Sequence, residues 1–159
     1  MIASALAAPA GAAQPCASSQ EADAIYVRHL QSRLVVAALS CGQQEAYNAF
    51  VTRHKADLGL HGPKLIAYFQ RAGGAKALNS FVTELANAAA AIRAANPEAF
   101  CNQTWTMFWS LQQRPDDLRT LAPSQIIPGV TQPAVCPPPG ATGSAPTQTA
   151  APKTGAAAR

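Results

Sequence analysis

Four cysteines, Cys16, Cys41, Cys101 and Cys136, are the residues of this 159-residue chain with the clearest capacity for chemistry. An even number of cysteines in a short chain favours disulfide bonds if the chain is exported to an oxidising compartment. The cysteines are widely spaced, and no two of them form a Cys-x-x-Cys pair. This spacing argues against a zinc site and against a thioredoxin-type redox pair.

Of the possible pairings, we expect Cys41–Cys101 together with Cys16–Cys136. Cys41 ends the apolar stripe of one expected helix and Cys101 begins that of another, so two antiparallel helices would bring these residues together. Cys16 and Cys136 flank the helical part of the chain and would join its ends. The main alternative is Cys16–Cys41 with Cys101–Cys136, which would make two local links. Free buried cysteines in a cytosolic protein are a third possibility.

The histidines, His29, His54 and His61, give no catalytic or metal-binding pattern. A histidine-activated nucleophile would need a free cysteine beside it, and disulfide formation removes the free thiols. His54 lies at the edge of an apolar stripe, where we expect a packed and hydrogen-bonded ring. The carboxylates are few and dispersed, so we predict no catalytic residues, no metal site and no cofactor.

The aromatic cluster Trp105, Phe108 and Trp109 makes one expected helix apolar over a wide arc. Trp105 and Phe108 fit an inward-facing stripe with Cys101 and Leu111, and core packing is the preferred interpretation. The alternative is that Trp105, Phe108 and Trp109 form a surface for a ligand or a partner.

The elements that must position these residues are helices. Apolar residues recur at steps of three and four over residues 21–41, 43–58 and 75–95. Gly62-Pro63 predicts a break and then a short helix that begins at Pro63, because proline suits the first turn of a helix. The pair Gly73-Gly74 is expected to end that helix.

Asn96-Pro97-Glu98 combines an N-cap residue, proline and an acid, and it predicts the start of a helix that runs to about residue 113. Pro115-Asp116-Asp117 predicts one more short turn of helix, closed by Pro123. The pattern ends at about Ser124, and nothing along the chain alternates as a strand does. The predicted fold class is therefore all-α, an irregular bundle of four to five short helices.

Three regions follow from composition. Residues 1–13 are small, apolar and uncharged, typical of the end of a signal peptide, with Ala10-Gly11-Ala12 as the cleavage motif and the true start expected upstream. Residues 14–136 are the expected disulfide-stapled domain. Residues 137–159 form a Pro/Ala-rich tail expected to be disordered. This organisation predicts a periplasmic or extracellular protein, and no segment is apolar for long enough to span a membrane.

The formal net charge of +4 comes from basic residues that are scattered singly. Nucleic-acid-binding proteins concentrate positive charge on one face. The charge pattern therefore argues against nucleic acid as a partner.

Four stretches of the chain resemble a family of small secreted proteins from alphaproteobacteria: Leu30–Gln44, Tyr47–Val51, Leu78–Asn87 and Phe100–Cys101. The resemblance covers residues 16–110, and the proline-rich tail departs from it. It implies export, a helical fold and structural roles for Cys41 and Cys101. It implies no activity.

Three functions remain open at this point. The first is a non-catalytic protein of the periplasm or envelope that binds a protein partner or stabilises an assembly. The second is a carrier of a small apolar ligand, with a pocket in the region Trp105–Trp109. A thiol- or histidine-dependent enzyme is the least favoured of the three.

Overall fold

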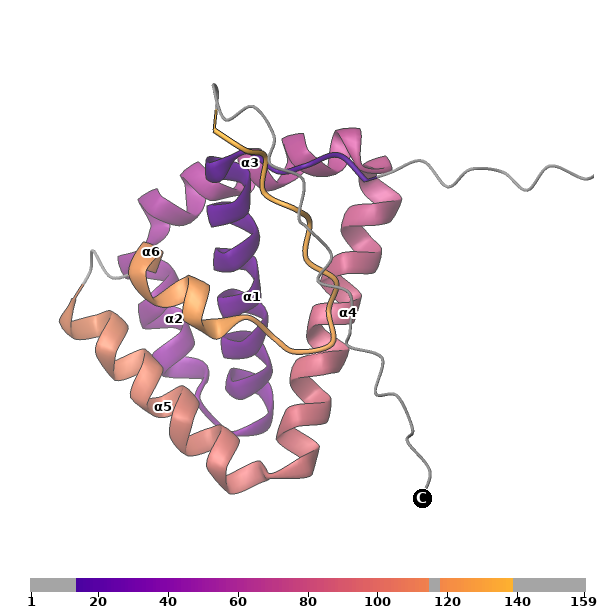
Figure 1. Ribbon diagram of the computed structural model, residues 1–159. Helices are drawn as coiled ribbons and strands as arrows, with labels where there is room; N and C mark the ends of the chain where they lie inside the picture. The colour runs from indigo at the N-terminus through magenta and orange to yellow at the C-terminus, as the bar shows by residue number, and fades with distance from the viewer. Residues whose placement is uncertain (1–13, 115–117, 139–159) are drawn as a thin grey trace, which may run out of the picture.

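The chain is a helical bundle in which one helix is surrounded by the others (Figure 1). The computed structural model describes residues 14–114 and 118–138, and these contain no β-strand, only an isolated bridge. The predicted all-α fold is confirmed. The helices are α1 (Ser19–Ser40), α2 (Gln44–Arg53), α3 (Lys55–Arg71), α4 (Gly74–Ala95), α5 (Pro97–Gln113), the short α6 (Leu118–Leu121) and the 3-10 helix η2 (Ala122–Gln125).

Helix α1 is the central element, and it starts with a complete capping box. The Ser18 side chain accepts a hydrogen bond from the backbone N–H of Glu21, and the Glu21 carboxylate accepts one from the N–H of Ser18. These two bonds satisfy N–H groups that have no partner within the helix. The start of α1 is therefore stabilised by residues of its own first turn.

The prediction of a single apolar face on α1 is wrong. Buried residues lie around the helix, and they include the polar residues His29 and Ser32. The reason is that α1 lies between two core clusters and contributes side chains to both. A helix that is covered on all sides needs no polar face.

The first core cluster packs α1 against α3, α4 and the segment that follows η2. The second packs α1 against α2, α5 and α6. Large, fully buried side chains occur in both clusters: Ile25, Tyr68, Leu85 and Ile127 in the first, and Leu30, Leu34, Phe50, Phe100, Phe108, Leu111 and Leu118 in the second.

The predicted helix break at Gly62-Pro63 is also wrong, because α3 continues through Pro63. A proline ring inside a helix conflicts with the side chain of the preceding residue and with the carbonyl four residues earlier. Here the preceding residue is Gly62, which has no Cβ, and the residue four positions earlier is Gly59. The break lies at His54 instead, where the buried ring places Nε2 3.2 Å from the carbonyl oxygen of Leu111 on α5.

The continuity of α3 has a measurable consequence at Gly59. A Cβ added there meets no atom within 4 Å, so Gly59→Ala should raise the free energy of unfolding by about 0.5–1 kcal/mol. Gly73→Ala is the control, because Gly73 has a φ of 121° and its added Cβ would lie 3.1 Å from that of Ala77; this variant should lose stability. Urea denaturation measures both, and no gain from Gly59→Ala would contradict a continuous α3.

The predicted boundaries of the following helices are confirmed. Gly73 and Gly74 both have positive φ values, and they lie at the junction where α3 has ended and α4 begins at Gly74. The Asn96 side chain accepts a hydrogen bond of 3.0 Å from the N–H of Ala99, and Pro97 is the first residue of α5. Both junctions use residues whose chemistry favours a helix end.

Two disulfides link the bundle, Cys41–Cys101 and Cys16–Cys136, which is the pairing expected from the sequence. Their Cα–Cα distances are 5.7 Å for Cys41–Cys101 and 5.0 Å for Cys16–Cys136. The first joins the end of α1 to the start of α5. The second joins the segment before α1 to the last described part of the chain. All four cysteines are in disulfides, so none is a free thiol.

The segment 126–138, here called the strap, follows η2 without regular structure and runs along the bundle (orange in Figure 1). The helical pattern does end near Ser124, as predicted, but the strap still belongs to the core because Ile127 and Val130 are buried in it. Among the helices within residues 14–114 and 118–138, none is both long and apolar enough to cross a membrane.

Three sequence-based predictions fall outside the described residues. They are the signal-peptide remnant at residues 1–13, the start of a helical turn at residues 115–117, and the disordered tail at residues 137–159, of which all but residues 137 and 138 lie outside the described part.

Candidate functional site

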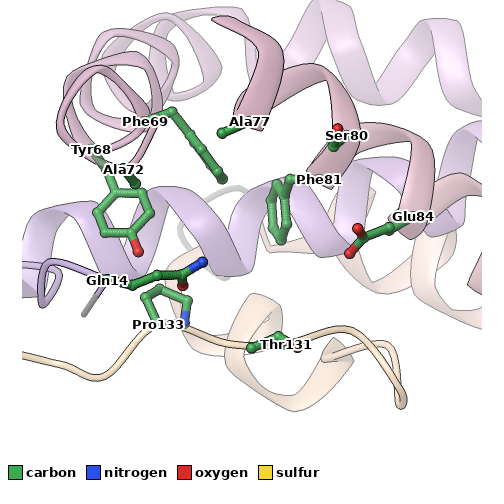
Figure 2. Close-up of a pocket in the computed structure, with 10 residues that line it drawn as sticks. All are labelled: Gln14, Tyr68, Phe69, Ala72, Ala77, Ser80, Phe81, Glu84, Thr131 and Pro133. Atoms are coloured by element: carbon green, nitrogen blue, oxygen red, sulfur yellow. The ribbon is translucent and has the colours of Figure 1, made fainter. Parts of the chain in front are cut away.

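A cavity of about 260 Å³ lies between the end of α3, the first half of α4 and the strap (Figure 2). Ligand sites of proteins are concave and mostly apolar, with a few polar groups that orient the ligand, and their volumes begin at about 300 Å³. This cavity is somewhat smaller, so it suits a ligand of few atoms. The residues that line it are Gln14, Tyr68, Phe69, Ala72, Ala77, Ser80, Phe81, Glu84, Thr131 and Pro133.

Aromatic rings from two helices form the helical wall of the cavity. Tyr68 and Phe69 are adjacent near the end of α3, and their ring centroids are 5.1 Å apart. The Phe81 ring of α4 lies 5.1 Å from that of Phe69. All three side chains belong to the first core cluster, so the packing of α3 on α4 fixes their positions. The wall is therefore built before any ligand arrives.

The strap closes the opposite side, where Thr131 and Pro133 face the aromatic rings across the cavity (Figure 2). Backbone hydrogen bonds hold the end of the strap against Ala17. The Ala17 N–H donates to the carbonyl of Ala134 at 2.8 Å, and the Cys136 N–H donates to the carbonyl of Ala17 at 2.8 Å. The Cys16–Cys136 disulfide closes the same contact covalently.

A buried histidine anchors the other end of the strap. Nδ1 of His29 on α1 accepts a hydrogen bond of 3.0 Å from the Ile127 N–H, and its Nε2 lies 2.7 Å from the side-chain amide of Gln132. Burial lowers the pKa of His29 to about 4, and the contact with Gln132 offsets this only in part. The ring is therefore neutral at pH 7, as it must be for Nδ1 to accept a hydrogen bond.

The polar groups of the cavity are an amide, hydroxyls and one carboxylate. Figure 2 shows the Tyr68 hydroxyl directed toward Gln14 and the Glu84 carboxylate at the far end of the opening. Burial raises the pKa of Tyr68, so its hydroxyl stays protonated and can donate a hydrogen bond. Glu84 is the only charged residue that lines the cavity within the part of the chain that the structure describes.

The nearest arginine is engaged elsewhere. Arg71 forms an ion pair of 2.7 Å with Glu21, and its guanidinium lies 5.9 Å from the centroid of the Tyr68 ring. The arginine holds the pKa of Glu21 at about 2, chiefly by hydrogen bonding. This ion pair joins the end of α3, where Tyr68 and Phe69 lie, to the start of α1.

This arrangement can bind a small molecule by contact with rings, by hydrogen bonds and by charge. Nucleophilic chemistry with a thiol is not available, because both cysteine pairs are oxidised. Within residues 14–114 and 118–138, no group of three or more histidine, cysteine, aspartate or glutamate residues could hold a metal ion.

The surface suggested by the sequence, Trp105, Phe108 and Trp109, is not an enclosed site. Phe108 is buried in the second core cluster, whereas Trp105 and Trp109 are each 60% exposed. The prediction that Trp105 faces inward is wrong. The two indoles line a small depression of about 50 Å³ together with Ala46, Phe108 and Gln112.

The reason for the error lies in which face of α5 is buried. The buried residues Phe100, Thr104, Phe108 and Leu111 form a continuous stripe, and Thr104 occupies the place that we assigned to Trp105. Its hydroxyl oxygen lies 3.0 Å from the Phe100 carbonyl oxygen and 3.0 Å from Oε1 of Gln43, so its single proton has an acceptor in either direction. A buried threonine whose hydroxyl donates to a backbone carbonyl of its own helix leaves no hydrogen-bond donor unsatisfied.

Sequence reasoning missed the cavity itself. It placed Tyr68, Phe69 and Phe81 on helices but gave no reason to expect the strap opposite them. His29 was also missed as an anchor, since its partners Ile127 and Gln132 lie about a hundred residues away in the chain. The contacts of His29 with the strap are recognisable only from its burial in the structure.

Comparison of the chain with protein-family models, with curated proteins and with solved structures finds no match. The resemblance to small secreted alphaproteobacterial proteins stays a prediction. The geometry of the cavity therefore carries the functional argument.

Proposed function

We propose that this chain is an exported, non-catalytic binding protein that holds one small organic molecule in the cavity between α3, α4 and the strap. The observation that carries the proposal is the construction of the cavity: aromatic rings on one side and a strap fixed at both ends on the other. A preformed site loses little conformational entropy when it binds, and this raises affinity.

Export is supported by the two disulfides, which are consistent with an oxidising compartment. Because the same two disulfides leave none of the four cysteines as a free thiol, they favour a binding role over thiol-dependent catalysis. This function is the second of the three left open by the sequence, a small-ligand carrier, and its pocket is in a different place from the expected region Trp105–Trp109.

The proposal is tested with a library of small organic fragments and NMR spectra of the ¹⁵N-labelled protein. At least one fragment should shift the backbone signals of Ser80 and Thr131, which line the cavity from α4 and from the strap. Ser80→Leu should weaken that fragment tenfold or more, because the longer side chain would occupy the opening beside Phe81.

The matched control is Thr52→Leu, which adds a leucine at an exposed position of α2. It should leave fragment binding unchanged. Fragments that bind equally well to both variants, or a library in which no fragment shifts the cavity residues, would contradict the proposal.

A second function, docking of a protein partner, is favoured by one specific observation. Trp105 and Trp109 are exposed side by side on α5, and tryptophans are enriched at the centres of protein interfaces. This hypothesis predicts that binding maps to the indoles rather than to the cavity.

A further inference from the structure

We infer that the molecule bound in this cavity is an alkylated ammonium ion, that is, a small organic cation whose charge is surrounded by carbon. The inference rests on the proposed function and names the ligand class for the same cavity. Three aromatic rings and one carboxylate, Tyr68, Phe69, Phe81 and Glu84, carry it.

The aromatic rings supply the first part of the argument. Phe69 and Phe81 are 5.1 Å apart with an interplanar angle of 36°, and Tyr68 meets Phe69 at 85°. The three rings thus line the cavity in different orientations. Aromatic faces attract cations, and grouped rings are the usual recognition element for alkylated ammonium groups.

The carboxylate supplies the second part. Glu84 lines the cavity from α4, and within residues 14–114 and 118–138 the one salt bridge is Glu21–Arg71. Glu84, an exposed side chain, thus forms no ion pair with Arg71, whose charge Glu21 neutralises, nor with Lys76, which lines a second depression together with Glu84. An unpaired carboxylate at the edge of a ring-lined cavity is complementary to a positive charge.

The make-up of the cavity wall indicates that the bound cation carries alkyl groups on its nitrogen. A bare ammonium group is strongly hydrated, and the loss of its water must be replaced by several hydrogen-bond acceptors. The cavity has one carboxylate, and its other acceptors include the neutral amide of Gln14 and the hydroxyls of Ser80 and Thr131. Aromatic or aliphatic carbon from Phe69, Ala72, Ala77 and Phe81 makes up slightly more than half of the wall. Alkylation removes N–H donors and adds apolar surface, so an alkylated cation fits this wall better than a primary amine does.

Choline is a suitable probe, because 3,3-dimethyl-1-butanol has the same shape without the charge. Calorimetric titration of the full chain should show that choline binds about tenfold more tightly than this neutral analogue. Glu84→Gln should reduce the ratio to about threefold, leaving the contribution of the rings, and should leave the affinity of the neutral analogue unchanged. Glu98→Gln, at an exposed acid on α5, is the matched control and should keep the full ratio.

The outcomes separate the ligand class from the proposed function. If choline and the neutral analogue bind equally and Ser80→Leu weakens both, the cavity binds small molecules but the cation assignment is wrong. The same conclusion follows if 3,3-dimethylbutanoate, the anionic analogue, binds best. If none of the three probes binds, the cation assignment is overturned, and the fragment library then decides whether the cavity binds anything at all.

Discussion

Replacement of Cys41 and Cys101 by serine should lower the free energy of unfolding by about 2–5 kcal/mol. The disulfide spans 60 residues and joins the end of α1 to the start of α5, so it restricts a large part of the unfolded chain. Both cysteines are partly exposed, and serine can be accommodated at each of them. Urea denaturation followed by circular dichroism measures the change.

The second disulfide provides a comparison with a different functional result. Replacement of Cys16 and Cys136 by serine removes a link that spans 120 residues, and the loss of stability should be similar or larger. It should also weaken fragment binding in the cavity, because the strap loses its covalent anchor. Loss of Cys41–Cys101 should leave binding unchanged at temperatures where the protein stays folded.

Two outcomes would contradict these predictions for the disulfide variants. Equal effects on binding would show that the strap does not depend on its own disulfide. An unchanged denaturation midpoint in either variant would contradict the structural role assigned to that bond.

The second large effect is a dependence of stability on pH through His29. The pKa of His29 is lowered from 6.5 to about 4 in the folded protein. Between these values the unfolded chain binds more protons than the folded one, so stability falls as the pH falls. The contribution is fully present above pH 6.5, and up to about 3 kcal/mol is lost by pH 4.

The structural cause is the bond between His29 and the strap. A protonated imidazole donates from both nitrogens, so Nδ1 could no longer accept the Ile127 N–H. We therefore expect the strap to loosen from α1 and binding in the cavity to weaken in the same pH range. Glu21 does not account for a loss of stability between pH 6.5 and 4.5. Its pKa lies at about 2, so its contribution to the stability of the fold is lost only as the pH falls below 4.5.

His29→Gln isolates the effect, since glutamine can accept the Ile127 N–H but cannot be protonated. The variant should show a much flatter dependence of stability on pH between 6.5 and 4.5. His61→Gln is the control: burial also lowers the pKa of His61, so this variant removes a separate contribution but leaves that of His29. An NMR titration of the His29 ring that gave a pKa near 6.5 would contradict the account.

The sequence was sufficient for features that depend on neighbouring residues. The ends of α4 and α5 were predictable because Gly73-Gly74 and Asn96-Pro97 determine backbone conformation locally. The pairing of Cys41 with Cys101 followed from the direction of two helices, each recognisable on its own.

Features that depend on distant residues could not be predicted in this way. Pro63 breaks helices in general, but here Gly62 removes the local conflict and the buried His54 side chain places the break elsewhere. Trp105 fits an apolar stripe by spacing alone, yet Thr104 takes the inward position because Gln43 of another segment provides a partner for its hydroxyl. In each case a contact between segments decided what local sequence left open.

The same limit applies to the candidate site. Phe69 and Phe81 were visible as apolar residues of two helices, but a cavity exists only because the strap returns across the bundle and is fixed by His29 and by Cys16–Cys136. The strap lacks a helix or strand pattern, so its position could not be predicted from the sequence.

The most direct test of the binding function is to locate a bound fragment by NMR, through nuclear Overhauser contacts between its protons and the side chains of the full-length protein. The account predicts contacts with the rings of Phe69 and Phe81 and with the side chain of Thr131. Contacts with the indoles of Trp105 and Trp109 alone would contradict it, and would place the binding function on the exposed face of α5.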